Sequence, residues 1–186
     1  MIRMAEKRKE KVEGKLVSDK VIVLRNTPEK DAVELLYSKN YFGSFEKNSL
    51  VLSLIESLFL IEQGKLVVRK SKNSFFDYDS FLRKSVRTDK RFLQRYIVFR
   101  NLRLRGYILR AALKYGADFL VYDRGKQPGK GHSKWLLFTA SESEMFSWRA
   151  WVANNRVAHS VRKKILLGIV DDNSDVTYYD IGWVRP

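Results

Sequence analysis

Apolar residues recur with two different periods along the chain, and each period predicts a different secondary-structure element. Alternating or short continuous apolar runs indicate β-strands, whereas apolar residues spaced by three and four positions indicate helices. The stretch KLVSDKVIVLR at 15–25 therefore predicts a strand, a turn and a second strand. TPEKDAVELLYSK predicts a helix, with Thr27 as its N-cap and Pro28 at its first helical position.

The next stretch alternates between polar segments and strongly apolar ones. We expect a loop over 40–48 around Gly43. SLVLSLIESLFLIEQG then predicts a mostly buried helix, with Ser49 as N-cap and Gly64 as its C-terminal stop. LVVRK at 66–70 predicts a strand, and SKNSFFDYD a loop. These elements together make a small α/β unit.

A new pattern begins after Thr88. RFLQRYIVFRNLRLRG predicts an amphipathic helix that stops at Gly106, with arginines outside. Its apolar positions are Phe92, Leu93, Tyr96, Ile97, Phe99 and Leu104. YILRAAL, DFLVYDR and KWLLFTA predict three strands, and NNRVAHSVRK a short helix that begins near Asn154 or Asn155. Two more strands, ILLGIV and VTYYDIGWV, follow on either side of the acidic turn DDNSD.

The order of these elements predicts an α/β (α+β) protein of two domains. The first, residues 1–85, is a small mixed α/β domain. The second, residues 86–186, is a mixed sheet flanked by helices. Because the first domain shows no pattern of chemical groups, we expect the second to carry the catalytic function.

The charge of the chain indicates a polyanionic partner. Its 186 residues hold 36 Lys and Arg against 21 Asp and Glu, a formal charge of +15. Residues 83–110 alone contain ten Lys or Arg and one acid, Asp89, with aromatic residues between them. This pattern is typical of nucleic-acid binding. A solvated basic helix face is the alternative.

Several classes of protein are disfavoured. The chain has no cysteine and two histidines, so neither a thiolate site nor a structural zinc site is expected, and we predict no metal and no cofactor. There is no Gly-rich phosphate loop and no Gly-x-Ser-x-Gly elbow. The longest apolar run, at 50–61, is short and contains Glu56, and no signal peptide precedes it. We expect a cytoplasmic protein that does not contact a membrane.

One histidine, His132, lies in the basic, glycine-rich stretch VYDRGKQPGKGHSKW. RNA can be cleaved without metal because its own 2′-hydroxyl is the nucleophile. The enzyme then supplies a base, an acid and a cation for the charged phosphorus oxygens. Histidine suits proton transfer near neutral pH, so His132 is a candidate for such a role. The alternative is a solvated loop residue. His159, in RVAHSVRKK, is interpreted as a packing or capping residue of its helix.

The motifs KYGADFLVYDRG, GHSKW and NNRVAHSVRKKILLGIVDDNSDVTYYDIGWV, within 114–184, resemble the catalytic domain of the archaeal-type tRNA-splicing endonucleases, the tRNA-intron endonuclease family. LVLSLIESLFLIEQGKL is similar to the N-terminal part of that family. The resemblance implies a catalytic triad in which Tyr122 is the general base, His132 the general acid and Lys163 the cation. The products would be a 2′,3′-cyclic phosphate and a 5′-hydroxyl. From the residues alone, Tyr122 could simply pack, and Lys163 and Lys164 cannot be told apart.

The resemblance also implies how the substrate is recognised. The family recognises precursor tRNA at a bulge-helix-bulge, and by position Arg156 and Trp183 would hold a flipped bulge base between them. Trp183 could equally be a core or interface aromatic residue.

The acidic turn has a second implied role, in assembly. Its carboxylates, Asp171, Asp172 and Asp175, would dock on another subunit and hold together a homotetramer. A plain hairpin turn is the alternative.

The expected function is therefore metal-independent excision of introns from precursor tRNA. Two alternatives remain. The chain could be a non-catalytic RNA-binding or structural subunit of a splicing endonuclease, or a metal-dependent nuclease on a related fold. The presence of Tyr122, His132 and Lys163 together argues against the first.

Overall fold

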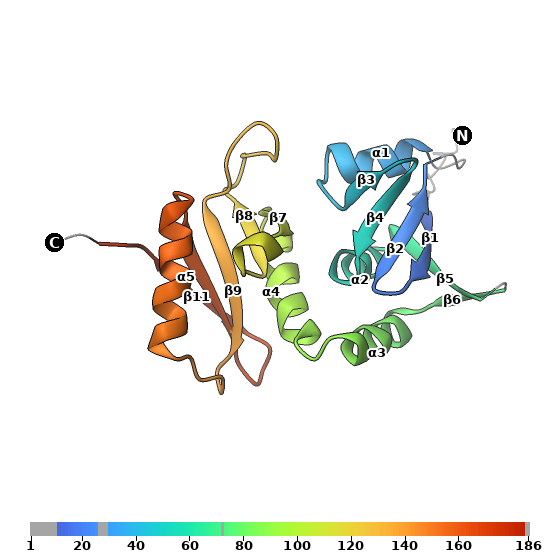
Figure 1. The fold of residues 1–186 in the computed structure, drawn as a ribbon. Helices are drawn as coiled ribbons and strands as arrows, with labels where there is room; N and C mark the ends of the chain where they lie inside the picture. Colours follow the sequence, from blue (N-terminus) through green and yellow to red (C-terminus); the bar gives the residue numbers. More distant parts are fainter. Residues whose placement is uncertain (1–10, 26–29, 72, 185–186) are drawn as a thin grey trace, which may run out of the picture. The chain divides into compact units, whose positions relative to one another are not determined.

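The computed structural model describes residues 11–25, 30–71 and 73–184. The chain divides into two compact units, Met1–Lys90 and Arg91–Pro186, coloured blue to green and green to red in Figure 1. Each unit is a mixed α/β structure with its own sheet, so the predicted fold class is confirmed. Thr27 and Pro28, expected to begin the first helix, lie outside the described residues. None of the helices in the described ranges is both long and apolar enough to span a membrane.

The first unit contains a six-stranded sheet with strand order β3-β4-β2-β1-β5-β6. β1 and β5 are parallel, and the other neighbours are antiparallel. The elements are β1 (Val12–Val17), β2 (Lys20–Leu24), α1 (Lys30–Ser38), β3 (Ser44–Glu46), β4 (Ser49–Ser53), α2 (Leu54–Glu62), β5 (Leu66–Ser71), β6 (Ser74–Phe76) and α3 (Tyr78–Thr88). The predicted strand pair at 15–25 and the strand at 66–70 are confirmed.

The helix expected to begin at Ser49 begins four residues later. Ser49–Ser53 is strand β4, which pairs with β2 and with β3. Ser53 is the N-cap of α2, and its hydroxyl accepts a hydrogen bond from the Glu56 backbone N–H at 3.2 Å. The Glu56 carboxylate accepts in turn from the Ser53 N–H, which completes a capping box. The predicted stop is correct: Gly64 has φ +64°, a conformation that glycine adopts without strain.

Two segments expected to be loops contain strands. Ser44–Glu46, within the predicted loop 40–48, forms β3, which pairs antiparallel with β4. Ser74–Phe76, within SKNSFFDYD, forms β6 and leads into α3. The Asp77 carboxylate caps α3 by accepting from the Ser80 N–H at 2.7 Å, and this bond holds the pKa of Asp77 below its usual value. Helix α3 was not predicted from the sequence.

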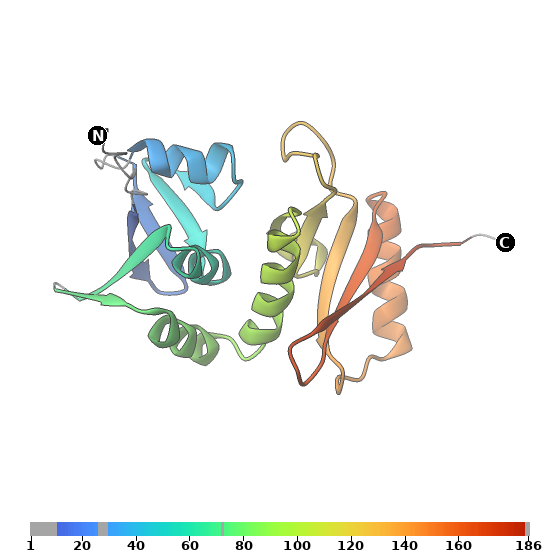
Figure 2. The ribbon, with the colours of Figure 1, turned by 180° about the vertical axis from the view of Figure 1, so that it is seen from behind.

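The second unit is a five-stranded sheet with strand order β11-β10-β9-β8-β7, placed between two helices (Figures 1 and 2). β9 and β10 are parallel, and the other neighbours are antiparallel. The elements are α4 (Phe92–Leu104), β7 (Ile108–Ala111), the 3₁₀ turn η1 (Leu113–Tyr115), β8 (Phe119–Tyr122), β9 (Trp135–Ser141), α5 (Trp148–Ser160), β10 (Lys164–Val170) and β11 (Val176–Ile181). The five predicted strands and the predicted C-terminal mixed sheet with flanking helices are confirmed.

The two helices cover opposite faces of this sheet. On the α5 face, Leu136 and Phe138 of β9 and Ile165 of β10 form a buried cluster with Ala158 of α5. On the α4 face, a side chain at Gly168 would come within 3.1 Å of Val98, so this glycine allows α4 to approach the sheet closely.

The two predicted helices of this unit differ from expectation in detail. α4 buries Phe92, Tyr96 and Phe99 as predicted, but Leu93 and Leu104 are about half exposed, because they lie on the side of the helix away from the sheet. α5 begins at Trp148 rather than near Asn154, because Ser147 is its N-cap and accepts from the Ala150 N–H at 3.2 Å.

Candidate active site

Three strands bring the predicted catalytic residues to one edge of the second sheet. β8 ends at Tyr122, β9 starts at Trp135 and β10 starts at Lys164, immediately after Lys163. Trp135 is paired with Val121 on one side and with Lys164 on the other. The end of β8 and the starts of β9 and β10 therefore lie side by side.

The loop from β8 to β9 carries His132 and projects from this edge (Figure 1). It is closed at its base by the Lys134 N–H, which donates to the Val121 carbonyl at 2.9 Å. The Lys134 carbonyl accepts from the Lys164 N–H at 3.1 Å, which ties the same point to β10. His132, two residues from this junction, is exposed. The imidazole is thus open to a ligand at the sheet edge.

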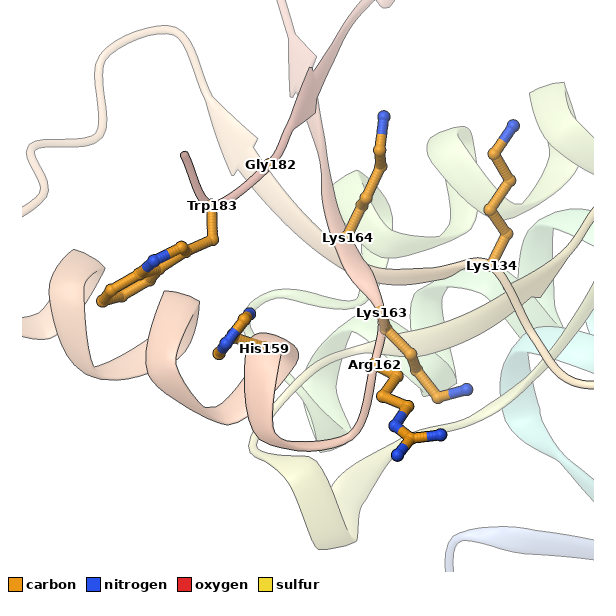
Figure 3. A pocket seen from close by; sticks show the side chains of 7 residues that line it. All are labelled: Lys134, His159, Arg162, Lys163, Lys164, Gly182 and Trp183. Carbon is orange, nitrogen blue, oxygen red and sulfur yellow. The ribbon is translucent and has the colours of Figure 1, made fainter. Parts of the chain in front are cut away.

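The two neighbouring lysines, which the sequence could not separate, have different surroundings. The Nζ of Lys163 donates to the Ser133 carbonyl at 2.9 Å, next to His132. The Nζ of Lys164 lies 3.2 Å from a carboxylate oxygen of Asp180. Figure 3 shows the two side chains leaving the chain in opposite directions. Lys163 is directed to the loop, and Lys164 is neutralised by an ion pair.

Tyr122 and Lys163 belong to the same face of the sheet. Tyr122 comes two residues after Leu120, and Lys163 two residues before Ile165. Leu120 and Ile165 both pack in the cluster under α5. Since side chains alternate between the two faces of a strand, Tyr122 and Lys163 are placed on the α5 face. Tyr122 is half-buried there.

Trp183, two residues after the end of β11, has an aromatic partner that the sequence did not indicate. Its ring is stacked on the imidazole of His159, with centroids 5.2 Å apart and planes inclined by 25°. His159, expected to pack or cap on its helix, is exposed on the last turn of α5. Arg156 is also exposed and precedes His159 by three residues, the spacing of neighbours on one helix face.

A pocket of about 350 Å³ lies beside His159 and Trp183 (Figure 3). Of the predicted catalytic and RNA-binding residues, Lys163 and Trp183 line it, whereas Tyr122, His132 and Arg156 do not. Its lining consists of Lys134, His159, Arg162, Lys163, Lys164, Gly182 and Trp183. Four cationic side chains and one indole suit a ligand that combines phosphate groups with a flat ring, such as a nucleotide. Lys134, His159 and Arg162 were not identified as site residues from the sequence. The sequence signal that could have indicated them is the presence of basic residues in and next to the GHS and VRKK motifs.

The acidic turn lies between β10 and β11, and its three carboxylates differ. Asp171 closes the turn: its Oδ1 accepts from the Asn173 N–H at 3.0 Å and from the Asp175 N–H at 2.8 Å. Asp172 and Asp175 are exposed. The predicted subunit-contact residues thus include one that holds the turn and two that face solvent.

In the described part of the chain, histidine and carboxylate side chains form no group of three or more that could hold a metal ion.

Known proteins share both units of this chain. Residues 92–178 match the family model of the tRNA intron endonuclease catalytic C-terminal domain, and residues 12–82 match that of its N-terminal domain. The tRNA-splicing endonuclease of Methanothermobacter thermautotrophicus is 37% identical over 176 residues, which cover 95% of this chain and 99% of the relative. That of Thermococcus kodakarensis is 38% identical over 84% of this chain and 91% of the relative, and that of Nanoarchaeum equitans 43% identical over 73% and 90%. The chain therefore belongs to the tRNA-intron endonuclease family.

Proposed function

We propose that this enzyme is a metal-independent endonuclease that excises introns from precursor tRNA at bulge-helix-bulge junctions, in the cytoplasm. Family membership supports tRNA intron excision. The observation that carries the finer proposal is the bond from Lys163 to the Ser133 carbonyl, which joins a cation to the loop of His132. Tyr122 ends its strand at the same edge of the sheet.

The reaction uses a nucleophile from the substrate itself. Tyr122 takes the proton of the 2′-hydroxyl, and the 2′-oxygen forms a bond to the adjacent phosphorus. The bond from phosphorus to the 5′-oxygen breaks, and His132 donates a proton to that leaving oxygen. Lys163 stabilises the additional negative charge on the phosphorus oxygens. One product ends in a 2′,3′-cyclic phosphate and the other begins with a 5′-hydroxyl.

Recognition of the junction rests on stacking. A bulge base is held by Arg156 and Trp183, through cation–π contact and ring stacking. The half-exposed indole of Trp183 is supported on one side by His159, so its other face is available to the base. The cations of the pocket then bind neighbouring phosphates.

A precursor tRNA has two splice junctions, and an assembly of identical chains would supply one active site for each of them. We propose a homotetramer in which the acidic turn of one subunit contacts a basic surface of another. The formal charge of +15 and the exposed carboxylates of Asp172 and Asp175 support this contact electrostatically.

A single assay separates this function from its alternatives. The purified chain is incubated with a bulge-helix-bulge RNA in excess EDTA, and the masses of the products are measured by mass spectrometry. We expect cleavage at both junctions, with 3′-terminal masses lower by one water than those of linear phosphates. A non-catalytic subunit would not cleave at all, and a metal-dependent nuclease would cleave only after Mg²⁺ is restored.

A further inference from the structure

Helix α5 ends in an arrangement that normally contains glycine. The Arg162 N–H donates to the His159 carbonyl at 3.0 Å, and the Lys163 N–H donates to the Ala158 carbonyl at 2.9 Å. This pair of bonds is the Schellman motif, in which the residue after the C-cap adopts the left-handed conformation. That residue is Arg162, with φ +55°.

A left-handed conformation is unfavourable for arginine. The Cβ of an L-residue approaches the following carbonyl oxygen there, and glycine avoids this contact. Folding alone therefore favours glycine at position 162. The arginine side chain offers no evident compensation, since it is exposed and has no hydrogen bond or ion pair with any of the residues that the structure describes. Lys47 is left-handed too, in a turn, so it is the position of Arg162 beside the pocket that makes its strain point to a function.

The unusual backbone determines where the guanidinium lies. Figure 3 shows the side chains of Arg162 and Lys163 on the same side of the chain, although the residues are consecutive, with Lys164 on the opposite side. Arg162 and Lys163 both line the pocket that also contains Trp183. Two cations, one of them unpaired in the described part of the chain, thus lie together at the proposed cleavage site.

We propose that Arg162 binds a phosphate of the RNA backbone next to the one at which the chain is cut. The inference rests on the proposed RNA cleavage. A guanidinium suits this position because its planar donors bind two phosphate oxygens at once. Since that phosphate keeps its charge throughout the reaction, Arg162 contributes to binding of substrate and transition state alike.

The test compares Arg162→Gly with a matched control, Lys47→Gly. Lys47 is an exposed cation in the β3–β4 turn and has φ +53°, so both variants lose one positive charge and relieve one left-handed residue. Binding is measured on a junction RNA that lacks the 2′-hydroxyl at the cleavage site. Arg162→Gly should raise Kd and KM roughly tenfold, with kcat changed less than about threefold. The slope of log Kd against log salt should fall by about one.

The melting temperatures test the premise about strain. Both variants should melt at least as high as the wild type, with a rise of about 1–3 °C, and Lys47→Gly should bind and cleave normally. Arg162→Lys should recover part of the lost affinity.

Three results would overturn the proposal: an unchanged Kd and salt slope in Arg162→Gly, a loss confined to kcat, or a clear loss of stability. Failure of the proposed function would be recognised separately, because then the wild-type protein itself would not cleave the junction RNA.

Discussion

Lys163 donates a hydrogen bond from its Nζ to the backbone carbonyl of Ser133, at 2.9 Å. The two residues are 30 positions apart, and the bond links the start of β10 to the loop that carries His132. Lys163 therefore holds the histidine loop and offers a positive charge at the same place. Lys164, on the opposite side, is engaged with Asp180.

This difference predicts opposite behaviour for two neighbouring substitutions. Lys163→Ala should lower the single-turnover cleavage rate by about 10²–10³-fold, because a preorganised cation for the transition state is lost. Lys164→Ala should cleave bound RNA within a few-fold of wild type, since it removes an exposed ion pair and one cation of the pocket but leaves Lys163 in place. Rates at saturating enzyme measure this directly. The reverse pattern would show that Lys164 is the catalytic lysine.

Substitutions of the two histidines should also have different effects, on the cleavage rate for His132 and on RNA binding for His159. His132→Ala should lower the cleavage rate by about two to four orders of magnitude and leave RNA affinity nearly unchanged, because general acid catalysis acts only in the transition state. His159→Ala is the control: it should weaken binding through Trp183 and cleave bound RNA normally. Wild-type turnover by His132→Ala would remove His132 from the mechanism.

Binding of the bulge base can be tested at three positions. Arg156→Ala and Trp183→Ala should each weaken binding of the junction RNA, since stacking of one base contributes roughly 1–3 kcal/mol. His159→Phe should bind better than His159→Ala, because a flat ring still supports the indole. These affinities can be measured by fluorescence anisotropy with labelled RNA. Normal binding by both Arg156→Ala and Trp183→Ala would show that these two residues do not hold the bulge base.

The order of the elements was predictable from the sequence, but their exact ends were not. SLVLSLIESLFLI is apolar enough to fit a strand or a buried helix, so its periodicity could not show that β4 ends and α2 begins at Ser53. Both Ser49 and Ser53 are suitable N-caps. Pairing of β4 with β2 decides between them, and that contact is distant in sequence.

The choice between these serines has a measurable consequence. Ser53→Ala should lower the free energy of unfolding by about 1 kcal/mol, because the N-cap of α2 and its capping box are lost. Ser49→Ala, in the strand, is the matched control and should have a smaller effect. Urea denaturation monitored by circular dichroism compares them. Equal destabilisation by the two variants would contradict the capping role.

The sequence motifs indicated which residues belong to the site, but not how the fold brings them together. Tyr122, His132 and Lys163 stood in recognisable segments, but their meeting at one sheet edge depends on the parallel pairing of β9 with β10. His159 and Trp183 are far apart in sequence and meet because β11 returns the chain to the end of α5. The left-handed backbone of Arg162 has no sequence signal, since a Schellman motif predicts glycine.

In the acidic turn, the hydrogen bonds that close the turn and the negative charges that could contact another subunit can be tested separately. Asp171 closes the turn through its Oδ1, which asparagine also possesses, so Asp171→Asn should keep both backbone bonds and lose one charge. Asp172 and Asp175 are exposed and available for contact with a basic surface of another subunit.

The double variant Asp172→Asn/Asp175→Asn should therefore dissociate the proposed tetramer to dimers, increasingly so at high salt because the contact is ionic. It should also lose precursor tRNA cleavage, although Tyr122, His132 and Lys163 are unchanged, because two spaced sites are needed. Asp171→Asn should remain closer to tetrameric. Light scattering at several salt concentrations gives the masses. A double variant that remains a tetramer would show that the acidic turn is a simple hairpin turn with no role in assembly.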